Sequence, residues 1–332
     1  MVTIKDVAKE SGVAISTVSN VLNNVDIVSP ETRKKVLEAV EKLKYVPNMN
    51  AKILKSNRKN TIGLFLSSIQ GDYYRMLMQA VHLQCKLKNY LLNIYISNEN
   101  TSEEIYGMII SSGVEGAIVL NERLSDEYID RIARTKLPIV FIDREYAGDH
   151  MSSVIIDNGE GVTLALEYLI KQGHRRIGYI HGIYNYDDKT RYQAFVNVMN
   201  KYSLPIDESI ILRGYFEETL AYSEMRVLLL KGIELPDAFF CANDEMAWGC
   251  IRALKEVGVS VPDQVSVIGF DDHYSSKHYT PSVTTIKSPV TELGNASTNE
   301  LFRLIQQEGP VNGEITRLSP SLVVRNSCKL KL

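Results

Sequence analysis

The sequence predicts a small all-α head followed by a larger α/β body built from two doubly wound parallel sheets. Three observations support this fold class. Helical patterns of apolar residues fill residues 3–43, strand-like apolar runs alternate with helical patterns from Thr61 onward, and the length of 332 residues exceeds that of a typical single domain. We therefore expect two or three cooperating units in one chain.

The head begins with two short amphipathic helices in residues 3–23. Gly12 separates their apolar stripes, which consist of Ile4, Val7 and Ala8 in the first helix and Val18, Val21 and Leu22 in the second. Two short helices joined by a turn that contains glycine are typical of a helix-turn-helix, in which the second helix enters the DNA major groove. Three arbitrary helices of a bundle remain an alternative interpretation.

A third helix has a clear start signal. Ser29 is the expected N-cap, Pro30 the first helical residue, and Glu31 lies beside the positive end of the helix dipole. Its expected core stripe is Val36, Leu37, Val40 and Leu43. Three such helices form a small core, near the lower size limit for independent folding.

The charge of the chain is unevenly distributed. Residues 1–60 contain 11 Lys and Arg against 6 Asp and Glu, a charge of +5, so the remainder carries -8 within the total of -3. Because phosphate neutralisation supplies most non-specific affinity for nucleic acid, this asymmetry predicts that only the head meets a polyanion. A solvated, charged helix face is the alternative.

Two segments of the head resemble a known family. The runs VAKESGVAISTVSNVLN and VSPETRKKVLEAVEKLKYVPN are similar to the head of the lactose-repressor/galactose-repressor (LacI/GalR) family of transcriptional regulators, and the resemblance continues through the rest of the chain. It implies that Ile15, Ser16 and Asn20 face base edges. The residues of the head expected to contact DNA are Thr3, Ile15, Ser16, Thr17, Ser19, Asn20, Asn23 and Ser29.

The head departs from the family pattern at two positions. Many members carry Arg where this chain has Asn20; Arg pairs with guanine, whereas Asn suits adenine, so we expect a different operator preference at that base pair. Ala14 stands where the family usually has Ser as the cap of the second helix. Because Ala cannot accept the free N–H groups, at a cost of about 1 kcal/mol, we expect a loose head off DNA.

A basic hinge follows at 47–60. The segment PNMNAKILKSNRK is too short to be a stable helix alone, and by composition it is equally well a flexible linker. The resemblance implies that it folds on the operator and inserts Leu54 into the minor groove as an apolar wedge that bends the duplex. The hinge residues expected to contact DNA are Asn48, Ala51, Lys52, Leu54 and Lys55.

The body contains strand-like runs separated by helical patterns: TIGLFL, LNIYIS, GAIVL, PIVFID, SVIID, RIGYIHG, AFFCA and VSVIGFDD. This alternation predicts parallel sheets whose ligands bind beyond the carboxyl ends of the strands. The body also resembles a two-lobed periplasmic-binding-protein fold for sugars. The expected units are the head 1–46, the hinge 47–60, a first effector subdomain 61–157 with 287–316, and a second 158–286 with 317–332.

Strand ends and family positions nominate residues for a cleft between the two lobes. The candidate effector-binding residues are Tyr73, Tyr74, Asp143, Arg144, Arg191, Phe216, Asn243, Asp271 and Ser288. Carboxylates at a strand end accept bonds from sugar hydroxyls, and the planar Arg191 fork holds vicinal hydroxyls or a carboxylate. Aromatic rings stack on sugar faces but fill cores equally well.

Each candidate has a structural alternative. Asp271 is alternatively a helix N-cap, Arg191 a surface arginine, and Asp143 the partner of Arg144 in an ion pair. Ser288 stands where the lactose repressor has a larger amide, which would leave room for a bulkier ligand.

Other classes of protein are disfavoured. Gly159 and Gly161 after VIID faintly resemble a dinucleotide fingerprint, but Leu164 replaces the third glycine, and no hydrolase, protease, P-loop or kinase motif is present. We therefore expect neither an NAD-dependent enzyme nor any cofactor. The four scattered cysteines indicate reduced thiols and no metal site. Without a signal sequence or an apolar span, we expect a cytoplasmic protein with no membrane partner, not a solute-binding protein for uptake.

The expected function is transcriptional regulation, most simply repression, of carbohydrate-metabolism genes. Two heads of a homodimer would read a palindromic operator, and a sugar or sugar derivative in the cleft would change operator affinity. A catabolite-control-type regulator with a protein co-effector is the alternative. No heptad tail follows SLVVRNS, which favours a dimer over a tetramer. The identity of the effector, the direction of its effect and the target genes stay open.

Overall fold

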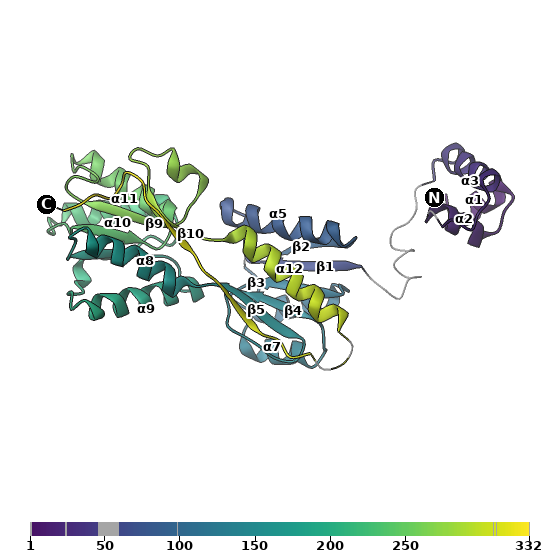
Figure 1. The fold of residues 1–332 in the computed structure, drawn as a ribbon, viewed down its shortest axis with the longest axis horizontal. Helices are drawn as coiled ribbons and strands as arrows, with labels where there is room; N and C mark the ends of the chain where they lie inside the picture. The colour runs from purple at the N-terminus through teal and green to yellow at the C-terminus, as the bar shows by residue number, and fades with distance from the viewer. Residues whose placement is uncertain are drawn as a thin grey trace. The chain divides into compact units, whose positions relative to one another are not determined.

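The computed structural model describes residues 2–23, 25–45, 60–97, 99–307, 309 and 311–331. The chain divides into two compact units, Met1–Lys59 and Asn60–Leu332 (Figure 1). The first unit is the predicted all-α head, and the second is the predicted α/β body.

The head consists of α1 (Ile4–Ser11), α2 (Ile15–Leu22) and α3 (Pro30–Lys42). Gly12 ends α1 with a φ of 69°, a left-handed conformation that glycine adopts without strain. Ser29 caps α3 by accepting a hydrogen bond from the backbone N–H of Thr32, as predicted. The six buried side chains that close the core are Val7, Ala8, Val18, Val21, Val36 and Ala39.

One core prediction in α3 is wrong. Leu37 is 49% exposed, whereas Ala39 is buried at 4%. The stripe runs from Val36 through Ala39 and Val40, at the spacing of one helical face, so Leu37 turns toward solvent.

The body contains two six-stranded sheets. The first has the order β11-β5-β4-β3-β1-β2, with all strands parallel. Its strands are β1 (Thr61–Leu66), β2 (Leu91–Ile96), β3 (Gly116–Leu120), β4 (Ile139–Ile142), β5 (Met151–Ile156) and β11 (Ile315–Leu318). The helices of this lobe are α5 (Gly71–Leu87), α6 (Ser102–Ser111), α7 (Asp126–Ala133) and α12 (Val290–Gln306).

The second sheet has the order β12-β10-β9-β8-β6-β7, in which only the β10–β12 pair is antiparallel. Its strands are β6 (Ile177–His181), β7 (Ile211–Arg213), β8 (Ala238–Cys241), β9 (Ser266–Asp271), β10 (Thr284–Lys287) and β12 (Ser321–Val323). Its helices are α8 (Asn158–Lys171), α9 (Tyr186–Lys201), α10 (Glu218–Leu230) and α11 (Asp244–Glu256).

The chain passes between the lobes after β5, after β10 and again after β11. The yellow C-terminal part of Figure 1 therefore runs along both lobes. Strands β10 and β11 were not predicted from the sequence. Both are four-residue strands that contain a charged side chain, so neither has the continuous apolar run of a fully buried parallel strand.

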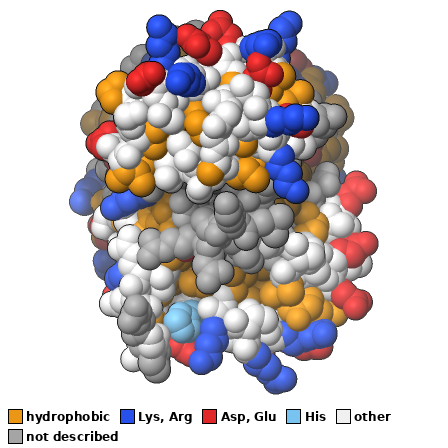
Figure 2. Space-filling view, turned by 90° about the vertical axis from the view of Figure 1, so that its right-hand side faces the viewer, with side chains coloured by type: hydrophobic (Ala, Val, Ile, Leu, Met, Phe, Trp, Pro, Cys, Tyr) orange, Lys and Arg blue, Asp and Glu red, His pale blue; other side chains and the backbone are white. Residues whose placement is uncertain are grey.

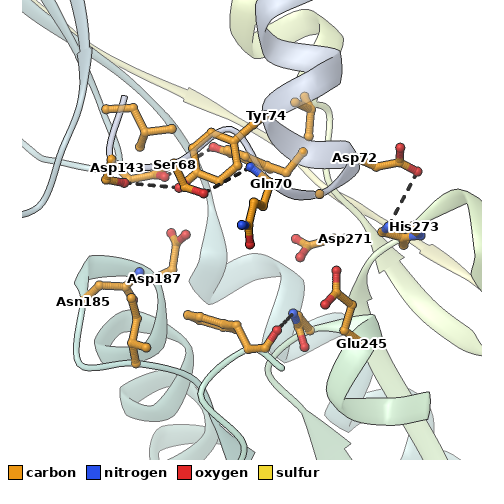
Figure 3. Close-up of a pocket in the computed structure, with 18 of the residues that line it drawn as sticks. Ser68, Gln70, Asp72, Tyr74, Asp143, Asn185, Asp187, Glu245, Asp271 and His273 are labelled. Carbon is orange, nitrogen blue, oxygen red and sulfur yellow. Dashed lines mark hydrogen bonds and ion pairs between the residues drawn. The ribbon is translucent and has the colours of Figure 1, made fainter. Parts of the chain in front are cut away.

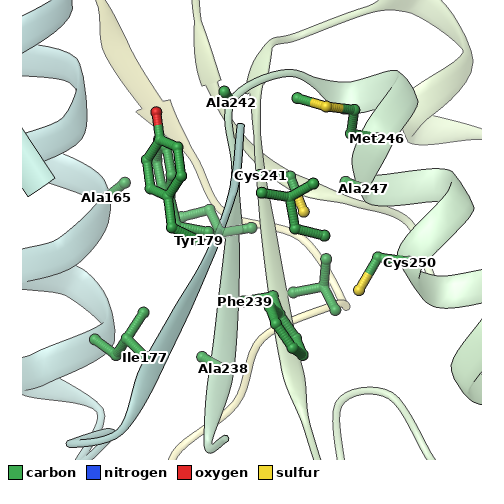
Figure 4. Close-up of a cluster of buried hydrophobic side chains, with 14 of the residues drawn as sticks. Ala165, Ile177, Tyr179, Ala238, Phe239, Cys241, Ala242, Met246, Ala247 and Cys250 are labelled. Carbon is green, nitrogen blue, oxygen red and sulfur yellow. The ribbon is translucent and has the colours of Figure 1, made fainter. Parts of the chain in front are cut away.

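The core of the second lobe is fully enclosed. Tyr179, Phe239, Phe240 and Phe270 have no exposed surface, and Figure 4 shows side chains of β6 and β8 packed against α8 on one side and α11 on the other. All four cysteines are free and buried. Such a closely packed lobe moves as a unit, so residues at its strand ends keep fixed positions relative to one another.

Among the helices of the described ranges, none combines the length and the apolar composition that a membrane span requires. Within the same ranges, no cluster of His, Cys, Asp and Glu is arranged to hold a metal ion.

Candidate functional site

The second helix of the head presents a polar surface opposite its buried side. Val18 and Val21 face the core, whereas Ile15 is 39% exposed and Ser16 and Asn23 are also exposed. Thr17, Ser19 and Asn20 are partly exposed. In the view of Figure 2, uncharged surface (white) and hydrophobic side chains (orange) lie together on the head, with Lys and Arg (blue) and Asp and Glu (red) around them.

The N-caps of α2 and α3 are the residues predicted from the sequence. Ala14 is the N-cap of α2 and makes no side-chain cap bond. Thr3 and Ser29, both expected to contact DNA, are exposed, but they also cap α1 and α3. The predicted hinge contacts Asn48, Ala51, Lys52, Leu54 and Lys55 lie outside the described residues.

A cavity of about 530 Å³ lies between the two lobes of the body. It opens at the carboxyl ends of strands from both sheets, and Figure 3 shows polar side chains from both lobes around it. Seven of the predicted residues line this cleft: Tyr73, Tyr74, Asp143, Arg191, Phe216, Asn243 and Asp271.

Arg191 in α9 is buried, with 4% of its surface exposed. Its Nε donates a 2.7 Å hydrogen bond to Asn158, its Nη1 donates to the carbonyl oxygen of Ala242, and its guanidinium lies 3.8 Å from the ring centre of Phe270. Only Nη2 faces the cavity carboxylates, at 3.7 Å from Asp271 Oδ1. The surface-arginine alternative is therefore wrong.

Asp271 ends β9 with a φ of 105°, a strained value for a residue other than glycine. Its Oδ1 accepts a 3.0 Å hydrogen bond from Ser288, and the next helical turn is capped by His273 instead. Ser288 is itself buried and does not line the cavity, so it positions Asp271. Burial raises the pKa of Asp271, and the Arg191 charge opposes that rise.

Asp143 and Arg144 point in different directions. Asp143 Oδ2 accepts a 3.3 Å hydrogen bond from Tyr73, whereas Arg144 reaches toward α7, 2.9 Å from Asp126 and 2.6 Å from the carbonyl oxygen of Leu124. Arg144, a predicted effector contact, does not line the cavity, because these partners hold its side chain outside it. The alternative Asp143–Arg144 ion pair is not formed between these two described residues either.

Asn243 and Phe216 form one edge of the cavity. Asn243 caps α11 by accepting a 2.9 Å hydrogen bond from the Met246 N–H, and its Nδ2 donates to the Phe216 carbonyl oxygen at 3.1 Å. The Phe216 ring packs on Gly182, where an added Cβ would lie 2.1 Å from it. Asn243 therefore fixes the loop that carries the aromatic ring.

Several lining residues were not predicted from the sequence. Asp187 in α9 accepts a 2.7 Å hydrogen bond from Asn158 and lies 3.8 Å from Arg191 Nη2. Its spacing of four residues from Arg191 in a helix was the available signal. Glu245 follows the capping Asn243 by two residues, and burial raises its pKa.

Contacts also bridge the lobes beside the cavity. Tyr186 in α9 donates a 2.8 Å hydrogen bond to Glu145, which follows β4 and also accepts from Arg317 in β11 at 2.7 Å. On another side, His273 Nε2 lies 3.6 Å from Asp72 Oδ2, a pair drawn in Figure 3. The Tyr186–Glu145 and His273–Asp72 pairs each join one residue of the first lobe to one of the second.

The chain is similar to known regulators along its whole length. Residues 3–48 match the profile of bacterial regulatory proteins of the lacI family, and residues 166–328 match that of the periplasmic binding protein-like domain. The HTH-type transcriptional repressor PurR of Pasteurella multocida is 36% identical over 100% of both chains. PurR of Haemophilus influenzae is 34% identical over 99% of both.

Solved structures of transcriptional regulators are also similar to this chain along nearly its whole length. The lac repressor dimer bound to operator and the anti-inducer ONPF is 28% identical, with a TM-score of 0.87 over 99% of both chains. The complex of the transcriptional regulator CelR with cellobiose is also 28% identical, with a TM-score of 0.73 over 98% of this chain and 100% of that one.

Proposed function

The chain belongs to the lacI family of bacterial regulatory proteins, and from this premise we propose that a small polar effector in the interlobe cleft controls its binding to operator DNA. The protein is a DNA-binding transcriptional repressor and not an enzyme. What we propose beyond this is the effector, its site, the dimer and the regulated genes.

The cavity between the lobes is the observation that carries the effector proposal. Asp143 comes from the first lobe, and Arg191 and Asp271 come from the second, so one ligand can contact both. A ligand that prefers one arrangement of the lobes shifts the equilibrium toward it. Coupling of this kind is typically about 1–3 kcal/mol, which changes operator affinity by about 5- to 150-fold.

A sugar or sugar derivative is the first candidate effector, with carbohydrate-metabolism genes as targets. Carboxylates around the cavity accept hydrogen bonds from hydroxyl groups, amide side chains both accept and donate them, and Phe216 offers an apolar ring. A flat heterocycle such as a purine base is the second candidate, because Tyr73 and Phe216 offer aromatic faces.

The proposed active form is a homodimer on a palindromic operator. An apolar strip lies along α5 and β2, where β2 is the edge strand of its sheet. Its members are 43–67% exposed: Leu83, Leu87, Leu91, Ile94 and Ile96. Apolar exposure along a sheet edge favours burial against a second copy, and two-fold symmetry of the protein then mirrors that of the DNA.

The test combines operator selection with ligand screening. Full-length protein is used to select operators from random DNA, and its thermal unfolding is then measured with a panel of sugars and purine bases. We expect a palindromic consensus, and a ligand whose stabilisation is lost in Asp271→Ala and Arg191→Ala. A ligand that stabilises the parent and both variants equally binds elsewhere and refutes the cleft assignment.

A further inference from the structure

The interlobe cavity has a large excess of acidic side chains. Nine Asp and Glu residues line it in the described part of the chain, against Arg191 and His273 as the basic ones. A neutral effector does not require this excess of negative charge. Amide and hydroxyl side chains of the protein would make the same hydrogen bonds to it without burying charge.

Some of these carboxylates already have partners. Asp272 pairs with Arg325, and Asp72 pairs with Arg75 at 2.9 Å. Asp244 accepts hydrogen bonds from His273 N–H and from two hydroxyl groups. Asp272, Asp72 and Asp244 therefore already use their carboxylate oxygens for contacts within the protein.

Six carboxylates remain along the cavity: Glu122, Asp143, Asp187, Glu217, Glu245 and Asp271. Figure 3 shows Asp187, Asp271 and Glu245 pointing into the same space. Within the described residues, neither Asp143 nor Glu245 forms an ion pair.

Arg191 compensates this charge only in part. Its Nη2 lies 3.8 Å from Asp187 and 3.7 Å from Asp271, longer than a direct hydrogen bond, and its Nε and Nη1 are used by Asn158 and Ala242. A ligand entering the cavity therefore meets mostly acceptors with negative charge.

The acidic groups also come from opposite lobes. Asp143 follows β4 in the first lobe, whereas Asp187 and Asp271 belong to α9 and β9 in the second. Burial, followed by repulsion from Asp187, raises the pKa of Asp143 well above the usual Asp range. The ionised forms of these carboxylates are therefore unfavourable in the empty cavity, and a cation bound between them would stabilise the ionised forms and link the two lobes.

We propose that the effector carries a protonated amino group beside its hydroxyls, bound between Asp143 of one lobe and Asp187 and Asp271 of the other. This inference rests on the proposed effector site and specifies its ligand class as a hydroxylated amine, such as an amino sugar. The ring of Tyr73, whose hydroxyl contacts Asp143, adds an aromatic surface of the kind that binds ammonium groups.

The test compares matched compounds on full-length protein by calorimetry. Glucosamine, galactosamine and mannosamine are each measured beside the neutral parent sugar and the uncharged N-acetyl derivative, with ethanolamine and putrescine as minimal amines. We expect amines to bind, and at least one amino sugar to bind about 30-fold or more tightly than both of its neutral counterparts. Neutral members that bind as well as the amines, or no binding by any amine at millimolar concentration, would overturn the proposal.

Two Asp-to-Asn variants test which carboxylates bind the protonated amino group of the ligand. In Asp187→Asn and in Asp143→Asn, the ratio of amine affinity to neutral-sugar affinity should each time fall most of the way toward 1. Glu224→Gln, at an exposed position of α10, is the matched control and should leave this ratio unchanged. A preference that survives in both cleft variants refutes the inference, provided that circular dichroism and operator binding show them folded.

The outcomes separate this inference from the proposed function. A neutral ligand whose binding is lost in Asp271→Ala and Arg191→Ala supports the effector site but contradicts the amine. If no tested compound binds in the cleft while the protein still binds its operator, both the effector site and the amine ligand are contradicted.

Discussion

Tyr186 of the second lobe donates a hydrogen bond to Glu145 of the first, with 2.8 Å between Oη and Oε1. Glu145 is held from the other side by Arg317, so the acceptor has a fixed position when the lobes approach. The bond lies beside the effector cavity, which Tyr186 also lines. The Tyr186–Glu145 hydrogen bond therefore stabilises the observed arrangement of the two lobes.

We expect Tyr186→Phe to loosen this arrangement. The variant keeps the ring but loses the hydroxyl, and one such bond contributes about 0.5–1.5 kcal/mol. Small-angle scattering should show a larger mean radius of gyration for the isolated body. The control is Tyr184→Phe, because Tyr184 is 84% exposed. Identical scattering from Tyr186→Phe and the parent would show that other contacts hold the lobes together.

Asp244 gives a prediction about pH. Burial raises its pKa to about 8 in the folded chain, against about 3.9 when unfolded. Folding thus favours the protonated form, and the stabilisation that this provides is complete below about pH 4 and is lost as the pH rises toward 8. Asp244→Asn resembles the protonated carboxyl. It should flatten the decline in unfolding free energy between these pH values.

The measurement is denaturant unfolding at several pH values, with Asp263→Asn as control, because Asp263 lies near the surface and pairs with Lys329. An unchanged pH profile in Asp244→Asn would mean that its three hydrogen-bond donors keep Asp244 ionised.

The missing cap of α2 predicts a stabilising substitution. Ala14 has extended backbone angles, φ -65° and ψ 151°, that suit an N-cap, but it makes no cap bond. Ala14→Ser should stabilise the head by about 1 kcal/mol. Hydrogen exchange of the α2 amides in the full-length protein measures this. Ser29→Ala, which removes the existing cap of α3, should change the exchange in the opposite direction.

Asn20 predicts an altered operator. Its side chain is partly exposed on the face of α2 opposite Val18 and Val21. Asn20→Arg should shift the preferred base pair at one position of each half-site from adenine toward guanine, with a discrimination of about 1–3 kcal/mol. Selection from random DNA with both proteins checks this. The same preference at every position would mean that Asn20 does not read a base.

Many features of the fold could be predicted from local sequence patterns. The features that could not be predicted depend on tertiary packing. Caps and buried apolar runs were predicted because each depends on a few neighbouring residues, as at Ser29 and in β1. The position of Arg144 outside the cavity was not predicted, because its partners Asp126 and Leu124 are brought near only by tertiary packing. Asp187 was missed because nothing local shows that its helix begins at the mouth of a cavity.

The apolar strip along α5 and β2 gives the final prediction. Ile94 is 43% exposed on the edge strand, and a charge there would be buried without a partner if the strip contacts a second copy. Ile94→Asp should therefore weaken self-association, measured by sedimentation, and reduce operator affinity because two heads no longer bind as one unit. Ile110→Asp is the matched control, since Ile110 is 40% exposed and belongs to α6, which contributes no residue to the strip. Dissociation by both variants, or by neither, would place the dimer contact on another surface, whereas loss by Ile94→Asp alone ties dimer formation and operator affinity to this strip.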